Sequence, residues 1–261
     1  MPAEHYIELV GKTIAVMEAL RDHPNGSVLQ QVAERTGQVK SSTHRILQSL
    51  KKHGYVDQES AGGMYRLGWR VATLMQGLSG NTGLQQFARP YLRELTESFK
   101  ESSYLAVLRS GRGIFVEVQE TRRDLRLVDP IGAEVHFHAT AAGKAMAAFF
   151  PAERQDQLLR ALPLARLTSH TLTDPSRVRD EWAVTRQRGY AVNEGETIVG
   201  AFFAAAPILD ANQQVCASLS VGVPQPRYSS EIGERLAVDL VESCRHISNT
   251  LQATGYVHDA G

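Results

Sequence analysis

The stretch HATAAGKAMAAFF, from His138 to Phe150, has some of the residue types of a phosphate-binding loop but not their spacing. A Walker loop has glycine five places before its Gly-Lys pair and serine or threonine after it. The bare amides hold the phosphate there, and the hydroxyl binds magnesium. Here His138 and Ala145 occupy those two positions. The chemistry therefore argues against a nucleotide site.

The same stretch still predicts a helix start that is open to a small anion. Thr140 is a good N-cap residue, and Ala141, Ala142 and Gly143 follow it with almost no side chain to cover their unpaired N–H groups. An anion would gain there from the amides and from the helix dipole. Alternatively, the small residues only let the helix pack tightly against a sheet, and these residues alone leave both interpretations open.

A metal site is a weaker hypothesis. His136 and His138 are two residues apart, and we expect them on one side of a strand, where Cys216 or Asp129 would have to complete the site. The spacing places no clear third ligand. We therefore expect no metal and no cofactor, and we expect His138 to order the turn into the helix by hydrogen bonding.

An enzyme is the main alternative from another functional class. It would use Cys216 or Cys244 as a nucleophile, or Lys144 as an amine, to transform a small molecule. The sequence contains neither the Gly-x-Ser-x-Gly elbow of hydrolases nor the His-Glu-x-x-His pattern of zinc peptidases. We therefore expect no enzymatic activity.

The composition is that of a globular protein with two domains. The chain has 261 residues, 43% of them hydrophobic and 21% charged, and no apolar run approaches the roughly 18 residues of a membrane span. Its start, MPAEHYIELV, lacks the features of a secretory signal. Two cysteines make a disulfide framework improbable. We expect a cytoplasmic protein.

Positive charge is concentrated in one segment. The whole chain balances 28 basic against 28 acidic residues, but between Arg35 and Arg70 seven Lys and Arg face only Asp57 and Glu59. The segment therefore carries a net charge of +5 by sequence, and the remainder carries −5. Local basic charge of this kind is typical of a surface that meets a polyanion.

Three helices and a hairpin are predicted in the first seventy residues. Tyr6–Arg21 is expected to be amphipathic, with Ile7, Val10, Ile14 and Met17 on its apolar face, and Ser27 with Gln30 predicts a capping box for a second helix. The third helix carries Val39, Thr43, Ile46, Leu47 and Leu50 on one face and ends at Gly54. YVDQESAGGMYRLG then predicts two short strands.

This order of elements indicates a winged helix-turn-helix that binds double-stranded DNA. A recognition helix enters a groove about 12 Å wide, so its outer face needs short donors and basic groups. We expect DNA contacts from Lys40, Ser41, Ser42, His44, Arg45, Gln48 and Lys52, and from Arg66 in the wing. A partner-binding protein with a degenerate helix-turn-helix is disfavoured by this intact polar face.

The sequence resembles the IclR-type bacterial transcription regulators over nearly its whole length. In the N-terminal part the resemblance rests on AERTGQVKSSTHRILQSLKKHGYV and MYRLG. In the remainder it rests on HATAAGKAMAAF, RGYAVNEGE, AAAPILDANQQV and ASLSVGVP, in the right order and at suitable spacing.

The remaining two thirds predict an α/β (α+β) fold, with an antiparallel sheet flanked by helices. Strands are expected at YLAVL, IFVEV, LRLVD, YAVNE, AFFAAAPIL and VCASLSVGV, and a long last helix from about Ser229 to Leu251. The resemblance implies a GAF-like effector domain. We place the winged helix at residues 1–68, a linker helix at 69–80 and the effector domain at 81–256.

The resemblance also implies a site for a small organic acid. The amides of Ala141 and Ala142 would bind its carboxylate, and Asn193, Phe203, Ser220 and Gly222 correspond to further pocket positions. The family often has Asp, Cys and Ser where this chain has Asn193, Phe203 and Gly222. Because Phe203 adds apolar surface and Gly222 makes room, we expect an aromatic or short hydrophobic carboxylate that alters operator binding or transcription.

The expected oligomeric state follows from the number of base pairs that one winged helix can contact. One winged helix contacts too few base pairs to specify a single site in a genome, so we expect a homodimer, or a dimer of dimers, on a near-palindromic operator. The segment from Leu67 to Gly80 is the expected dimer connector, with Leu74 and Met75 in its apolar seam.

Overall fold

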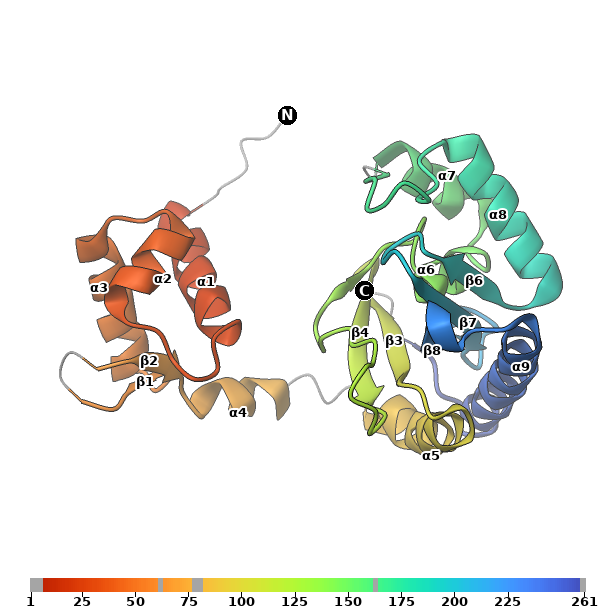
Figure 1. Cartoon of the computed structure of the whole chain (residues 1–261), viewed down its shortest axis with the longest axis horizontal. Coiled ribbons are helices and arrows are strands. Elements are labelled where there is room, and N and C mark those ends of the chain that lie inside the picture. Colours follow the sequence, from red (N-terminus) through yellow and green to blue (C-terminus); the bar gives the residue numbers. More distant parts are fainter. Residues whose placement is uncertain (1–6, 61–62, 77–81, 162–163, 259–261) are drawn as a thin grey trace. The chain divides into compact units, whose positions relative to one another are not determined.

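The chain divides into two compact units, Met1–Asn81 and Thr82–Gly261 (Figure 1). The structure, a computed structural model, describes residues 7–60, 63–76, 82–161 and 164–258. No helix among these residues is both long and apolar enough to cross a membrane.

The first unit is a winged helix-turn-helix, as the sequence predicted. A buried cluster that includes Val16, Val32, Leu47 and Val56 joins its helices to its hairpin. The two strands of the hairpin are antiparallel. Its elements are α1 (Glu8–Arg21), α2 (Leu29–Thr36), α3 (Lys40–Lys52), β1 (Val56–Gln58) and β2 (Tyr65–Leu67).

The apolar face predicted for α1 is confirmed at Met17, which packs against the buried cluster, but is wrong at Ile7, Val10 and Ile14. Val16 and Leu20 are the residues that α1 buries, whereas Ile7, Val10 and Ile14 are each more than half exposed. The sequence has apolar residues on more than one side of this helix, and hydrophobic spacing alone does not show which side meets the core. In α3 the predicted face is confirmed except at Val39, which is exposed.

The capping box predicted at Ser27 is also wrong. The N-cap of α2 is Val28, whose backbone N–H donates to the side chain of Gln31 at 3.2 Å. Ser27 instead pairs with Tyr65 of the hairpin through two backbone hydrogen bonds, and its hydroxyl accepts from Arg35 at 2.8 Å. Ser27 therefore joins the loop before α2 to the wing.

The described part of the connecting segment is α4 (Arg70–Gln76). Leu67 belongs to β2, so the helix begins later than the Leu67 start that the sequence suggested. Leu74 on α4 is exposed, whereas the side chain of Met75 and residues 77–81 lie outside the described part of the chain.

The second unit contains a six-stranded antiparallel sheet in the order β5-β4-β3-β8-β7-β6, flanked by helices (Figure 1). Its strands are β3 (Ser103–Arg109), β4 (Arg112–Gln119), β5 (Glu134–Val135), β6 (Ala191–Glu194), β7 (Ala201–Leu209) and β8 (Val215–Pro224). Its helices are α5 (Thr82–Phe99), α6 (Ala141–Ala147), α7 (Ala152–Ala161), α8 (Pro175–Arg188), the 3-10 turn η2 (Gln225–Arg227) and α9 (Ser230–Ala253).

Alternation along the central strands gives the sheet two buried faces. On β7, Phe202 packs with Tyr228 and the core formed with α5 and α9, while the next residue, Phe203, belongs to the core formed with α6 and α8. On β8, Leu219 likewise faces α5 and α9, so Ser220 faces the α6 side. The α6 face therefore receives Phe203 and Ser220 together.

The strand predicted at LRLVD does not form. Residues 125–129 have no partner strand among the described residues, and two of their backbone carbonyls accept hydrogen bonds from side chains instead. The carbonyl of Leu125 accepts from Arg227 at 2.9 Å, and that of Leu127 accepts from the phenol of Tyr104. These bonds hold an irregular segment beside the sheet. The segment ends at Asp129, which is partly buried.

Candidate functional site

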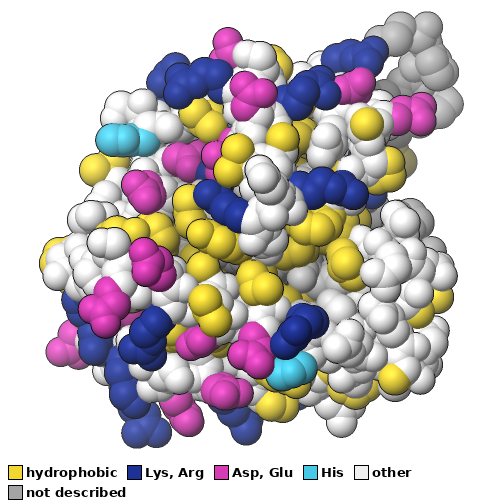
Figure 2. Space-filling model, turned by 90° about the vertical axis from the view of Figure 1, so that its right-hand side faces the viewer, with side chains coloured by type: hydrophobic (Ala, Val, Ile, Leu, Met, Phe, Trp, Pro, Cys, Tyr) yellow, Lys and Arg dark blue, Asp and Glu magenta, His cyan; other side chains and the backbone are white. Residues whose placement is uncertain are grey.

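The polar face of α3 is open to solvent. Lys40, Ser41, His44, Arg45, Gln48 and Lys52 are all exposed, and Ser42 is partly exposed. Thr43, Ile46, Leu47 and Leu50 anchor the opposite face. Over the face of the molecule in Figure 2, by contrast, Lys and Arg are interspersed with Asp and Glu. The predicted DNA contacts on α3 thus share its exposed side, and Arg66 lies apart from them on β2.

Side-chain hydrogen bonds join α3 to the wing. Gln48 donates to the hydroxyl of Tyr65 at 3.3 Å, and Lys51, which the sequence analysis did not single out, donates to Gln58 at 3.0 Å. Arg66 forms an ion pair with Glu59 at 2.8 Å and donates to the carbonyl of Asn25 at 3.2 Å. A DNA contact by Arg66 would therefore replace an existing ion pair.

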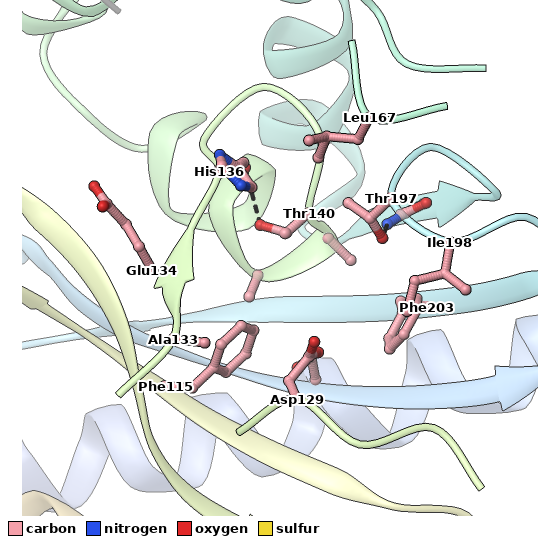
Figure 3. Close-up of a pocket in the computed structure, with 14 residues that line it drawn as sticks. Phe115, Asp129, Ala133, Glu134, His136, Thr140, Leu167, Thr197, Ile198 and Phe203 are labelled. Atoms are coloured by element: carbon pink, nitrogen blue, oxygen red, sulfur yellow. Dashed lines mark hydrogen bonds between the residues drawn. The ribbon is translucent and has the colours of Figure 1, made fainter. Parts of the chain in front are cut away.

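A cavity of about 220 Å³ lies between α6 and the sheet in the second unit (Figure 3). Five of the six residues predicted for effector binding line it: Ala141, Ala142, Asn193, Phe203 and Ser220. The other lining residues are Phe115, Asp129, Ala133, Glu134, His136, Thr140, Leu167, Thr197 and Ile198. They come from strands on the floor and from loops around α6.

The start of α6 lines this cavity with Thr140, Ala141 and Ala142. The hydroxyl of Thr140 accepts from the N–H of Gly143 at 3.0 Å, and its carbonyl accepts from Lys144 at 2.9 Å. Within the described residues, the N–H groups of Ala141 and Ala142 have no such partner. A Cβ on Gly143 would lie 2.4 Å from the carbonyl oxygen of His136, so glycine permits this turn. The helix is thus both tightly packed and open at its first amides.

Asn193 shapes one wall of the cavity through hydrogen bonds within the chain. Its side-chain oxygen Oδ1 accepts from the backbone N–H of Glu196 at 2.8 Å, and its side-chain nitrogen Nδ2 donates to the hydroxyl of Thr197 at 2.7 Å. Thr171 then donates to the carbonyl of Glu196 at 2.6 Å, which connects this loop to the loop that carries Leu167. The two loops above the cavity are therefore held together.

Phe203 and Gly222 form a large and small pair on neighbouring strands. They are direct partners in the register of β7 and β8. A Cβ added to Gly222 would lie 2.5 Å from the ring of Phe203, closer than any real contact. Gly222 does not line the cavity itself, but its missing side chain is the space that the Phe203 ring occupies. The two departures from the family pattern are thus physically coupled.

The two histidines considered as metal ligands do not lie on a strand. β5 ends at Val135, so His136 and His138 lie in the turn before α6. The prediction that they share one side of a strand is therefore wrong. His138 is buried and donates to the carbonyl of Ala165 at 3.0 Å, and burial lowers its pKa. Over the described ranges there is no group of three or more metal-ligating side chains. His138 instead fastens the turn to the loop after α7.

The residues considered for catalysis have structural roles. Lys144 is buried and forms ion pairs with Glu196 and, at 3.6 Å, with Glu181. Burial raises the pKa of Glu196, although Lys144 opposes this rise. Cys216 and Cys244 are both buried, and burial raises the pKa of both thiols, that of Cys244 to about 12. A protonated thiol is a poor nucleophile.

Several cavity residues were not predicted from the sequence. Phe115, Thr197 and Ile198 carry no motif and approach the cavity only through the sheet and the folded loops. Asp129 was considered solely as a metal ligand, although its position in VDP, after an apolar run, marks it as an acid beside a strand-like segment. No signal in the sequence placed these residues together.

Comparisons with known proteins identify both units. Residues 76–249 match the family model described as bacterial transcriptional regulator IclR C-terminal, and residues 9–60 match the IclR helix-turn-helix domain. The chain is 30% identical over 224 residues to the HTH-type transcriptional regulator BhcR of Paracoccus denitrificans, which covers 86% of this chain and 80% of the relative.

Solved structures share the fold over almost the whole chain. The Thermotoga maritima IclR structure aligns with a TM-score of 0.79 and 22% identity, over 95% of this chain and all of that one. An IclR homologue from Microbacterium hydrocarbonoxydans, complexed with 4-hydroxybenzoate, aligns with a TM-score of 0.78 and 24% identity, over 94% of this chain and all of that one. With both domain models matched in order, this chain belongs to the IclR family of DNA-binding bacterial transcriptional regulators, which are not enzymes.

Proposed function

We propose that a small organic acid, an aromatic or short hydrophobic carboxylate, binds in the cavity of the second unit and alters operator binding or transcription by this regulator. The observation that carries the proposal is the cavity itself. At one end it has the amides of Ala141 and Ala142, which have no partner within the described residues, and the rings of Phe115 and Phe203 line it.

The start of α6 favours an effector that carries a carboxylate. Among the fourteen residues that line the cavity there is no lysine or arginine, so the amides are the strongest fixed donors available to an anion. Amides at a helix start are oriented before binding and gain from the helix dipole. Ser220 supplies a hydroxyl from β8, and Asn193 can use the remaining N–H of its amide.

The walls of the cavity favour an effector with an apolar body. Phe115 and Phe203 present aromatic rings, and Leu167 and Ile198 close the space above them (Figure 3). The volume of about 220 Å³ is below the roughly 300–1,000 Å³ of pockets for drug-sized ligands, so the effector is small. The 4-hydroxybenzoate complex of the Microbacterium homologue supports this class of ligand.

Operator binding is assigned to α3 and the wing. Exposed donors and basic groups lie along one side of α3, and they suit phosphate and base-edge contacts in a major groove. We assign base or phosphate contacts to Arg45, which has no side-chain partner within the described residues, and to the remaining members of the predicted set. This set is Lys40, Ser41, Ser42, His44, Gln48, Lys52 and Arg66.

A homodimer, or a dimer of dimers, is proposed to bind a near-palindromic operator. Exposed apolar side chains in the first unit support an interface with a second copy: Ile7, Leu9, Val10 and Ile14 on or before α1, and Leu74 on α4. A pair of winged helices reads two half-sites and so multiplies specificity. Binding to chromosomal DNA implies the cytoplasm. A chain that stays monomeric by light scattering, both free and on DNA, would contradict this assembly.

Thermal-shift screening of the full chain against carboxylic acids tests the effector class. A ligand that binds only the folded state stabilises it by about 2.7 kcal/mol at a hundred times its dissociation constant. We expect aromatic and short hydrophobic acids to raise the unfolding temperature of the second unit, and polar two- and three-carbon acids to do so less. Stabilisation by the small polar acids alone would contradict the proposed class.

A further inference from the structure

The cavity contains an acidic group that a carboxylate effector has to avoid. Asp129 lies at the end of the irregular segment held by Tyr104 and Arg227, and its carboxylate points into the space between Phe115 and Phe203 (Figure 3). The start of α6 lies across this space from it. The two ends of the cavity thus differ in electrostatic character.

Asp129 has no partner within the described residues. No ion pair or side-chain hydrogen bond joins it to them, and burial raises its pKa without an opposing effect from a basic group. The phenol of Tyr104 is close, but its proton goes to the carbonyl of Leu127. A partly buried carboxyl without a donor costs free energy, which a ligand that supplies a donor recovers.

The other titratable lining residues make no hydrogen bond or ion pair with Asp129 within the described part of the chain. Glu134 is the first residue of β5, His136 lies in the turn after this strand, and both are exposed. The side chain of Glu134 points away from the centre of the cavity (Figure 3). An unsubstituted acid therefore places its anion at the amides and leaves the Asp129 carboxyl facing hydrocarbon.

We propose that Asp129 selects effectors that carry, besides the carboxylate, a hydroxyl or amino group on the far side of a short apolar body. The carboxylate binds at the amides of Ala141 and Ala142, and the hydroxyl or amino N–H donates to Asp129. This inference rests on the proposed function, because it assumes an acid in the cavity. It adds the second polar contact and makes Asp129 the residue that determines specificity.

Discrimination follows from the unpaired carboxyl. A site built to accept a hydrogen bond from a substrate hydroxyl rejects the analogue without it strongly, because the buried polar group is then left without a partner. A hydrogen bond to a charged acceptor is also stronger than a neutral one. The preference for a substituted acid should therefore be at least about tenfold in dissociation constant.

Calorimetric titration of the full chain with benzoate, the hydroxybenzoate isomers and the aminobenzoates tests this proposal. Wild type is expected to bind at least one substituted acid about ten times more tightly than benzoate. In Asp129→Ala this ratio should fall to about two or less, with benzoate binding retained. Asp129→Asn, which keeps an accepting oxygen without the charge, should keep part of the ratio. Asp124→Ala changes an exposed aspartate of the same segment and should leave the ratio unchanged.

Equal binding of benzoate and all substituted acids by wild type would overturn the role of Asp129. So would an unchanged ratio in Asp129→Ala. Failure of the proposed function itself has a different signature. In that case no aromatic or short hydrophobic acid stabilises wild type in the thermal-shift screen, or Ala142→Asp binds benzoate as well as wild type does, and the Asp129 proposal fails with it.

Discussion

The two units of this chain place their functional groups in opposite ways. In the winged helix-turn-helix, the residues assigned to DNA project outward from α3, and the opposite face of the same helix holds the small core together. In the second unit, the predicted effector residues that line the cavity are buried and come from α6, β6, β7 and β8: Ala141, Ala142, Asn193, Phe203 and Ser220. A surface on one helix depends on one local segment, whereas a cavity depends on the whole fold.

This difference explains how well each region could be predicted. The spacing of Thr43, Ile46, Leu47 and Leu50 fixes the buried face of α3, and the exposed face follows from it. The start of α6 is equally local, since Thr140 and the small residues after it define the cap. These features were predictable from a few consecutive residues.

The pairing of strands that are distant in the sequence could not be predicted. Nothing in the order of residues brings Asp129 and Phe115 to the start of α6, because their approach depends on the pairing of β3, β4 and β8. The strand predicted at LRLVD failed for the same reason, since side chains of Tyr104 and Arg227 bind its carbonyls. The apolar side of α1 was misassigned because both sides look apolar in sequence.

Ala142→Asp should have the largest effect on the second unit. The new carboxylate would crowd the cavity and repel an approaching anion, so we expect no detectable binding of the acid by calorimetry. Ala152→Asp places the same charge at the exposed start of α7 and is the matched control. Unchanged affinity in Ala142→Asp would mean that the ligand does not lie at the start of α6.

Arg45→Ala should abolish specific operator binding without unfolding the first unit. Loss of a specific DNA contact costs about 1–3 kcal/mol. Footprinting on sites selected from a random duplex pool measures it. Arg21→Ala, which removes an exposed arginine at the end of α1, should leave the footprint unchanged. If the Arg45 variant folds and protects the site as tightly as wild type, the assignment of α3 is wrong.

Gly222→Ala should destabilise the second unit by about 1–3 kcal/mol, because its new methyl group overlaps the ring of Phe203. In the background of Phe203→Cys, the same substitution should cost little, and urea unfolding of both single variants and the double variant measures this coupling. Phe203→Cys by itself should shift effector preference toward smaller, more polar acids. Equal costs in the two backgrounds would show that Phe203 and Gly222 are independent.

Ser220→Ala should have the smallest effect. Its hydroxyl adds one hydrogen bond to the bound acid, so its loss should weaken binding by about 1 kcal/mol in calorimetry. Ser218→Ala is a useful comparison, because the Ser218 hydroxyl donates to the carbonyl of Ala142 at 3.2 Å and is not a cavity residue. An acid that binds Ser220→Ala and wild type equally would place its polar end elsewhere in the cavity.

The central claim is that a buried acid site in one unit controls an exposed DNA surface in the other. Footprinting of wild type and Ala142→Asp on the selected operator, with a binding acid titrated in, tests it most directly. Without acid the two proteins should protect the site equally, and with acid the protection, or the transcription from that promoter, should change for wild type alone. An equal response of both proteins to the acid, or loss of operator binding by Ala142→Asp without it, would contradict the account.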